Sequence, residues 1–229
     1  KQFGKAIIEF PAVYDMLATI KAKLDAGRAL LYQTSRYVDI YKALDDIARE
    51  RKLTPEERQE QKRYAKLADS FTPLAKGMNS EYANQNAYDC IQVHGGSGFM
   101  MEYACQRIYR DARITSIYEG TTQLQTVAAI RYVTNGAYAA TLHEYELIPC
   151  APEFEGYLNR IKDMTRKLEA CTNAVKEAQN QELLDFVARR LYEMAAVCVM
   201  SHLLLQDATK APELFAQSLN VYVNYAESE

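Results

Sequence analysis

The sequence predicts an all-α protein: a bundle of long up-and-down helices followed by a C-terminal group of about three further helices. Apolar residues recur at intervals of three and four along most of the 229 residues, which is the spacing of a buried helix face. No segment shows a convincing strand pattern, in which apolar and polar residues alternate. Four of the nine glycines lie between residues 95 and 120, so sharp turns are concentrated there.

The first predicted helix begins at Pro11, a residue that suits the first turn of a helix, and extends to about Arg49. Its predicted buried face carries Val13, Leu17, Ile20, Leu24, Gly27, Leu31, Thr34, Val38 and Tyr41. At about 1.5 Å per residue, such a helix would be roughly 60 Å long. It is too long for a compact globule and suits a bundle.

The charge-rich segment between residues 45 and 66 is interpreted as a solvated connection between helices. Within it, Thr54, Pro55 and Glu57 have the spacing of a helix start, with Thr54 as N-cap and Glu57 completing a capping box. We expect this second helix to end at Gly95, a suitable left-handed C-cap. Its predicted apolar face is formed by Tyr64, Leu67, Ala68, Phe71, Leu74, Ala75, Met78 and Tyr82.

The next segments are shorter. We expect a short helix from about residue 102 to 112, followed by an extended or irregular segment at 114–119. Thr121 or Thr122 can cap the helix that follows, which ends near residues 135–136.

A linker containing two prolines at 147–152 then precedes three further helices, at 154–179, 182–207 and 212–227. We therefore predict two units, a helical bundle at 1–146 and a C-terminal helical extension at 147–229.

Composition excludes several functional classes. The net charge of −3 argues against a general nucleic-acid surface, which needs a basic excess. The sequence contains no run of about 20 apolar residues, so no membrane span is predicted. Five scattered cysteines without a C-x-x-C motif predict reduced, mostly buried thiols in a reducing compartment. His143 and His202 lack metal-ligand spacing, so no metal site is predicted.

The glycine-rich segment Gly95–Gly98 has two interpretations. A dinucleotide-binding fingerprint is rejected, because a helix rather than a strand precedes it and Met101 stands where the third glycine is needed. The segment can simply be a helix C-cap and turn. Alternatively, its glycines can bring backbone N–H groups close to phosphate or pyrophosphate oxygens.

The second candidate is Tyr118–Thr122, with the sequence YEGTT. A carboxylate just before a helix N-terminus is favoured by the helix dipole, so Glu119 can be a capping acid. It can equally be a general base whose ionised form the helix end stabilises. Gly120 would then give a ligand close access to the backbone.

Together these motifs resemble the C-terminal helical domain of acyl-CoA dehydrogenases. The matching segments are Gln92–Phe99, Glu102-Tyr103, Arg107–Ile114 and Ile117–Thr121, in the family's order and spacing, with Phe3-Gly4-Lys5 at the expected distance upstream. The resemblance covers about residues 1–145, and the rest is similar to an extension found in a mainly bacterial subgroup. On this resemblance the chain is a fragment that lacks the family's N-terminal helical and middle β-domains and the first bundle helix.

The resemblance implies a role for each site residue. Glu119 would be the catalytic base, with Tyr118 and Gly120 beside the substrate. Thr121 and Gln123 would contact FAD in the same subunit. Five residues would contact the FAD of a neighbouring subunit: Gln92, Val93, His94, Gly95 and Gly96. Phe3 lies at a further flavin-contact position of the family. Pro11 replaces a family glutamine, and Thr126 stands where many members have arginine.

The implied activity is oxidation of an acyl-CoA to a trans-2-enoyl-CoA, as in fatty-acid β-oxidation, with electrons passing through FAD to an electron-transfer flavoprotein. A homo-oligomer, dimer or tetramer, is implied, located in the bacterial cytoplasm or the mitochondrial matrix. We expect the chain alone to be inactive. Two alternatives remain: an acyl-CoA oxidase, which tends to carry an acidic residue after the Glu-Gly pair, and a non-catalytic helical assembly module.

Overall fold

A computed structural model of the chain describes residues 1–228 and confirms the all-α prediction. Extended residues pair only at one isolated bridge between Gln2 and Lys5 within that range. The elements in order are η1 (Ile7–Glu9), α1 (Pro11–Glu50), α2 (Pro55–His94), α3 (Gly96–Phe99), α4 (Ala104–Thr115), α5 (Thr122–Thr134), α6 (Ala137–Glu146), η2 (Pro152–Phe154), α7 (Glu155–Glu177), α8 (Gln181–Lys210) and α9 (Pro212–Ser228).

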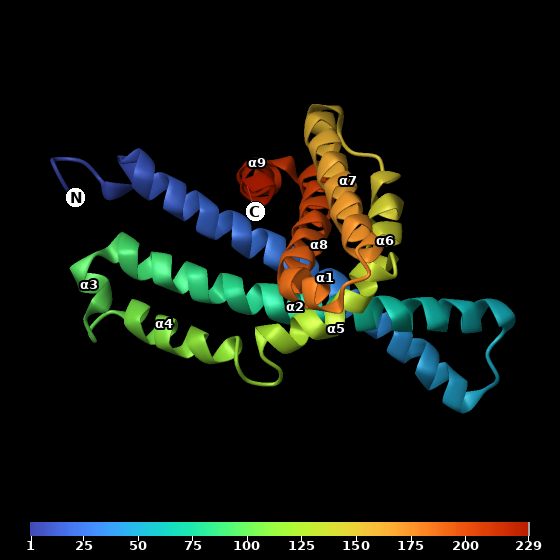
Figure 1. Cartoon of the computed structure of the whole chain (residues 1–229). Helices are drawn as coiled ribbons and strands as arrows, with labels where there is room; N and C mark the ends of the chain where they lie inside the picture. The colour runs from blue at the N-terminus through green and yellow to red at the C-terminus, as the bar shows by residue number, and fades with distance from the viewer. Residues whose placement is uncertain (229) are drawn as a thin grey trace.

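Helices α1 and α2 form a long antiparallel hairpin around which the other helices are arranged (Figure 1). Each contains 40 residues, which corresponds to about 60 Å. The predicted capping box begins α2: the Glu57 N–H donates to Thr54 Oγ1 at 3.2 Å, and the Thr54 N–H donates to Glu57 Oε2 at 2.8 Å. Two N–H groups without helical partners are thereby satisfied, which fixes the start of the helix.

The predicted buried face of α2 is confirmed, but the prediction for α1 is partly wrong. Leu24 and Leu31 are 49% and 48% exposed. The buried face of α1 is rotated about the helix axis relative to the predicted one, and α2, α8 and α9 cover it. Its members include Ala22, Ala26, Leu30, Thr34, Tyr37 and Leu44. Leu24 and Leu31 line an open groove instead.

The connection between α2 and α5 differs in detail from the sequence prediction. Gly95 has the predicted positive φ of 59°, but its ψ of −145° lies outside the left-handed helical region. Helix α4 begins two residues later than expected and continues through Ile114 and Thr115, so the irregular segment before α5 is limited to residues 116–121. The β-branched residues stay helical because α4 packs along α2.

The C-terminal helices pack on the hairpin through α8, which contacts α1, α5, α7 and α9. Tyr192 and Leu204 of α8 are fully buried, and Tyr222 of α9 lies 2.9 Å, oxygen to oxygen, from Tyr82 of α2. The three predicted C-terminal helices are confirmed. Their buried residues belong to the same hydrophobic cluster as those of α1 and α2, so the core is continuous across both predicted units.

All five cysteines are free thiols, as predicted. The prediction that they are mostly buried is wrong. Only Cys105 and Cys198 are buried, while Cys90 and Cys150 are partly exposed and Cys171 is exposed. Across residues 1–228, none of the helices combines the length and apolar character needed to cross a membrane.

Candidate functional site

The turn between α4 and α5 carries Glu119 in an unusual backbone conformation. Glu119 has φ = 50° and Gly120 has φ = 97°. A left-handed conformation costs a non-glycine residue about 1 kcal/mol or more, and such strain is concentrated at functional sites. Phe3, Glu119 and Gln179 are the non-glycine residues with positive φ in the described part of the chain, and two of these three are predicted site residues.

A lysine of α2 holds both ends of this turn. The Lys76 Nζ donates to the carbonyl oxygen of Thr115 at 2.8 Å and to that of Gly120 at 2.7 Å. The Ser80 hydroxyl, one helical turn further along α2, also donates to the Thr115 carbonyl, at 2.9 Å. Charged donors make stronger hydrogen bonds than neutral donors do. The shape of the turn is therefore fixed from the body of the bundle.

Gly120 is favoured by its backbone conformation, and a larger residue would also displace the side chain of Gln125. A Cβ atom at this position would lie 2.6 Å from Nε2 of Gln125, the group that donates to the Gly120 carbonyl at 3.2 Å. Thr121 then caps α5 by accepting from the Leu124 N–H at 3.3 Å, as predicted. Thr122 is buried and donates from Oγ1 to Glu81 on α2 at 2.5 Å.

Backbone hydrogen bonds inside the turn leave the N–H groups of residues 119–121 without an acceptor within residues 1–228. The N–H groups of Ile117 and Tyr118 donate to Ile114, and that of Thr122 donates to Ser116. Among the described residues, the N–H of Glu119 has no acceptor. The turn therefore offers a carboxylate and a free backbone donor from one residue.

Beside the turn lies a groove of about 600 Å³ between α1 and α2. Glu119 and Tyr118 line one side, and the exposed Leu24 and Leu31 of α1 line the other. A groove of this size is within the range of small-molecule sites. Sequence periodicity assigned these leucines to the core, so it missed their place beside Glu119.

The second predicted cluster, Gln92–Gly96, lies at the other end of α4. Helix α4 has 12 residues, or about 18 Å, and separates the end of α2 from the turn at 116–120 (Figure 1). The structure therefore does not bring Gln92, Val93, His94, Gly95 or Gly96 together with Glu119. A Cβ atom built on Gly95 or Gly96 would meet no atom within 4 Å, so these backbones face open space.

Phe3 lies near the N-terminus and is 88% exposed. Its φ of 49° turns the chain before α1, and its ring stands edge-on to Phe10 with centroids 6.4 Å apart. Thr121 and Gln123 are also exposed, at the N-terminal end of α5. None of the predicted site residues is buried.

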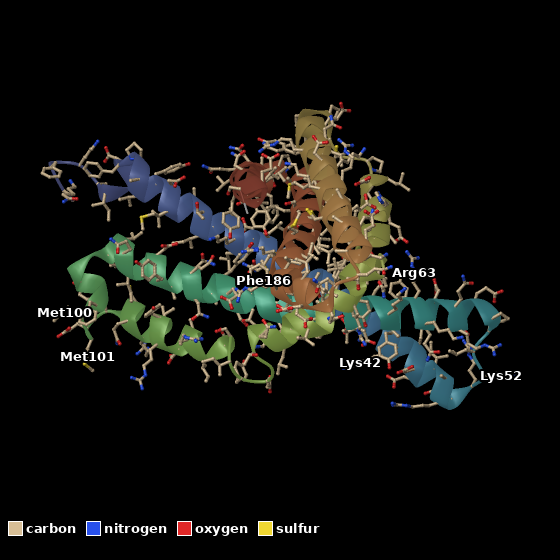
Figure 2. All side chains as sticks on the ribbon, viewed as in Figure 1. Lys42, Lys52, Arg63, Met100, Met101 and Phe186 are labelled. Atoms are coloured by element: carbon tan, nitrogen blue, oxygen red, sulfur yellow. The ribbon has the colours of Figure 1, made fainter. Side chains whose placement is uncertain are left out.

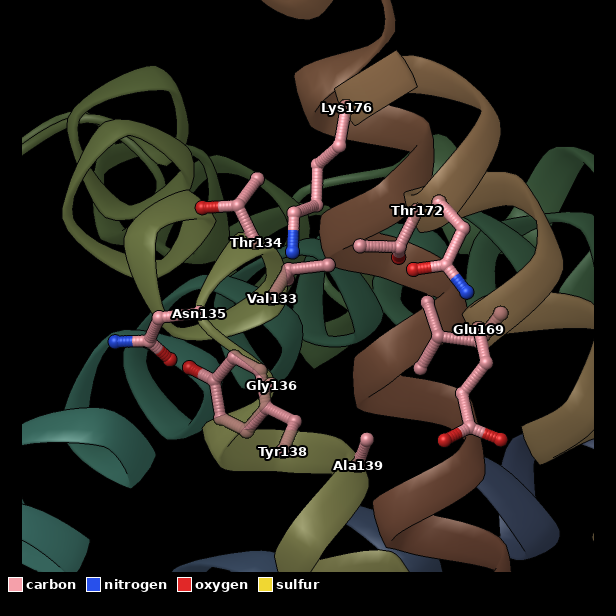
Figure 3. Close-up of a pocket in the computed structure, with 11 residues that line it drawn as sticks. Val133, Thr134, Asn135, Gly136, Tyr138, Ala139, Glu169, Thr172 and Lys176 are labelled. Carbon is pink, nitrogen blue, oxygen red and sulfur yellow. The ribbon is translucent and has the colours of Figure 1, made fainter.

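A different hollow lies where the α5–α6 junction meets α7 (Figure 3). It has a volume of about 130 Å³ and contains none of the predicted site residues. Lys176 and Glu169 of α7 belong to its lining, together with Thr134. Ligand sites usually exceed about 300 Å³, so the groove beside Glu119 is the better candidate.

The fold and the turn define a helical domain of the acyl-CoA dehydrogenase class. Residues 1–133 match the family model described as "Acyl-CoA dehydrogenase, C-terminal domain", and residues 134–229 match a second described as "Acyl-CoA dehydrogenase C terminal". The chain belongs to the acyl-CoA dehydrogenase family.

Among curated relatives, the chain is 34% identical over 125 residues to the caffeyl-CoA reductase–Etf complex subunit CarC of Acetobacterium woodii, a match covering 55% of this chain and 27% of that protein. It is 37% identical over 119 residues to 3-methylmercaptopropionyl-CoA dehydrogenase of Ruegeria pomeroyi, covering 52% of this chain and 18% of that protein. The chain thus spans about a quarter of these relatives or less.

Two solved structures share the fold. Caenorhabditis elegans ACDH-11 in complex with C11-CoA superposes with a TM-score of 0.76 at 19% identity, covering 100% of this chain and 38% of that one. An acyl-CoA dehydrogenase complexed with FAD from Bacillus anthracis gives 0.73 at 21% identity, covering 99% of this chain and 41% of that one. The superposition includes the C-terminal helices, so α7–α9 belong to the shared fold.

Proposed function

We propose that this chain provides the C-terminal helical part of an FAD-dependent acyl-CoA dehydrogenase, which converts an acyl-CoA thioester into a trans-2-enoyl-CoA. The observation that carries the proposal is the position of Glu119, on a strained turn clamped by Lys76 and facing an apolar groove. An acyl chain in the groove would place its thioester at the turn. We carry the substrate class over from the acyl-CoA relatives and neighbours.

Glu119 is proposed to remove the α-proton of the thioester. A carboxylate is a sufficient base for this step when it is positioned at the carbon and water is excluded. The N–H of Glu119, which has no acceptor in the part of the chain that the structure describes, would donate to the thioester oxygen as negative charge develops there. Glu119 is exposed in this chain, so other parts of the complete enzyme would have to cover it and exclude water.

The residues present fit an FAD site in two parts. Thr121 and Gln123 are exposed at the N-terminal end of α5, where helix N–H groups favour phosphate and polar ligands. Gly95 and Gly96 have open backbones at the end of α2, which permits close approach of a ligand. FAD would supply the acceptor for the β-hydride. Gln92–Gly96 and Phe3 would serve the FAD of a neighbouring subunit.

A homo-oligomer follows from this division of the site. The loop next to Gly95 and Gly96 exposes Phe99, Met100 and Met101, and the two methionines point outward from the bundle (Figure 2). Adjacent exposed apolar side chains are typical of an interaction surface. The electron acceptor we propose is an electron-transfer flavoprotein, by analogy with the relative that forms an Etf complex.

The test is Glu119→Gln in the complete enzyme, with Glu102→Gln as a matched control on the exposed α3–α4 loop. We expect the Glu119 variant to retain FAD and lose nearly all dehydrogenation, while the control keeps normal activity. Activity within about tenfold of wild type, a loss of only about 1.4 kcal/mol, would place the base elsewhere. Reoxidation by oxygen in place of the flavoprotein would instead identify an acyl-CoA oxidase.

The isolated chain provides a second test. We expect it to fold but neither to bind FAD tightly nor to turn over, because most of its predicted site residues are exposed on its surface. A stoichiometric flavin retained through purification would contradict this. If the isolated chain folds, and substitutions of its site residues do not change the activity of the complete enzyme, the chain is a purely structural module.

A further inference from the structure

Two thiols and an imidazole meet where α2 ends and α4 begins. Cys90 and His94 are one helical turn apart on α2, and Cys105 lies in the first turn of α4. One potential ligand atom from each residue lies within 4.8 Å of the other two. His94 belongs to the Gln92–Gly96 segment described above, but the two cysteines do not. Local sequence spacing does not reveal the cluster, because its third member comes from another helix.

The donor set is that of a zinc site. Thiolate sulfur and imidazole nitrogen bind Zn²⁺ at about 2.3 and 2.0 Å in tetrahedral geometry, which requires separations of about 3.5–3.8 Å between ligand atoms. The three candidate ligand atoms, one from each residue, already lie within 4.8 Å of one another. The three side chains therefore need to close by only about 1 Å.

The histidine is also held in a suitable form. Its Nδ1 lies 2.8 Å from the backbone oxygen of Cys90. Because a carbonyl oxygen only accepts, Nδ1 must carry the hydrogen, which leaves the lone pair on Nε2 for a cation. Metal-binding histidines commonly donate their other N–H to a backbone carbonyl in this way.

Burial is graded across the cluster. Cys105 is 6% exposed, Cys90 is partly exposed and His94 is exposed. A cation could therefore enter from the side of His94 and be held against the two sulfurs, and water could occupy the fourth position.

We propose that Cys90, His94 and Cys105 bind one Zn²⁺ ion, which ties the end of α2 to the start of α4. The ion would use the imidazole of His94 and leave the backbone of Gly95 and Gly96 open to solvent. This proposal does not depend on the proposed enzymatic activity, since it concerns side chains that lie about the length of α4 from Glu119.

The experiment is a titration of the reduced, metal-free chain with Zn²⁺ against a colorimetric chelator, repeated with Co²⁺ to detect thiolate charge-transfer absorption. We expect one equivalent to bind. Cys90→Ser and Cys105→Ser should each weaken Zn²⁺ binding at least 100-fold, and His94→Gln at least tenfold. Cys171→Ser, an exposed thiol on α7, is the matched control and should bind like wild type.

Circular dichroism of each variant without metal separates loss of the site from loss of the fold, and His94→Gln, being exposed, should fold normally. Zinc should also raise the unfolding temperature of wild type and of Cys171→Ser, but not that of Cys105→Ser. Absence of stoichiometric binding would overturn the proposal. So would binding that survives in the Cys90→Ser, Cys105→Ser double variant.

Discussion

Lys76 donates a hydrogen bond from Nζ to the backbone oxygen of Gly120, 2.7 Å away, although the two residues are 44 positions apart. The same amino group reaches Thr115 at the opposite end of the turn. One side chain of α2 therefore holds both ends of the turn that presents Glu119. Glu119 itself makes no hydrogen bond that fixes its carboxylate, so we expect its position to depend on Lys76.

The first prediction concerns Lys76→Met, which keeps the aliphatic stem and removes the donors. Two backbone oxygens would lose a charged partner, so we expect the free energy of unfolding of the chain to fall by about 2 kcal/mol. In the complete enzyme, displacement of Glu119 should lower kcat about 10- to 100-fold with FAD retained. Denaturant unfolding and acyl-CoA-dependent flavin reduction measure the two effects.

Lys66→Met is the matched control, because Lys66 is an exposed lysine of the same helix. Faster hydrogen exchange at residues 116–122 should accompany Lys76→Met and be absent from the control. If Lys76→Met leaves both kcat and this exchange unchanged, the lysine does not position Glu119.

Sequence alone predicts features that depend on nearby residues. The start of α2 at Thr54, Pro55 and Glu57 could be predicted because its hydrogen bonds join residues three apart. The role proposed for Glu119 came from a motif whose order and spacing match the family over some thirty residues. Both signals are contained in one short segment.

The features that sequence missed depend on distant parts of the chain. Periodicity shows that Leu24 and Leu31 lie on an apolar stripe, but not whether protein or a groove covers that stripe. Lys76 meets its acceptors across 39 and 44 residues, and Cys105 meets Cys90 only because α4 folds back along α2. No local pattern contains these relationships.

The groove gives a second prediction. Leu24→Trp should fill part of the 600 Å³ space opposite Glu119. In the complete enzyme we expect kcat/KM to fall more than tenfold for the longest acyl-CoA accepted and much less for the shortest. Leu124→Trp is the control, since Leu124 is similarly exposed on α5 but lies outside the groove. A uniform loss for all chain lengths would argue that the groove does not hold the acyl chain.

A third prediction tests the contact between α2 and α8. A Cβ atom on Gly77 would lie 2.1 Å from the hydroxyl oxygen of Tyr192, which donates to the Pro73 carbonyl at 3.1 Å. We expect Gly77→Ala to lower the free energy of unfolding by about 1–3 kcal/mol through overpacking. Denaturant unfolding measures the change.

Gly156→Ala on α7 is the control, because a Cβ atom there meets nothing within 4 Å, and the change should be neutral or stabilising by up to about 1 kcal/mol. Combining Gly77→Ala with Tyr192→Phe removes the clashing oxygen. The double variant should therefore be less destabilised than the sum of the single variants. Simple additivity would show that the two groups do not interfere.

The last prediction is a pH dependence of stability that originates at His202. This histidine is 1% exposed on α8, beside the ring of Tyr145. Burial, with smaller contributions from Lys162 and His143, lowers its pKa to about 4 from 6.5. Between these values the unfolded chain binds more protons than the folded chain. The stabilising contribution is thus complete above pH 6.5 and is lost as pH falls towards 4, on the order of 3 kcal/mol in total.

His202→Leu removes this titration, so the free energy of unfolding of the variant should fall less steeply than that of wild type between pH 6.5 and 4. The difference between the two curves isolates His202, because the carboxylates are common to both. His143→Gln tests a pH dependence of the opposite sign, at a histidine that also makes a small contribution to the pKa of His202. The pKa of His143 is raised by Glu169 and Glu146, so the contribution of His143 to stability is present below pH 6.5 and is lost as pH rises. Parallel curves for wild type and His202→Leu would mean that the pKa of His202 is the same in the folded and the unfolded chain.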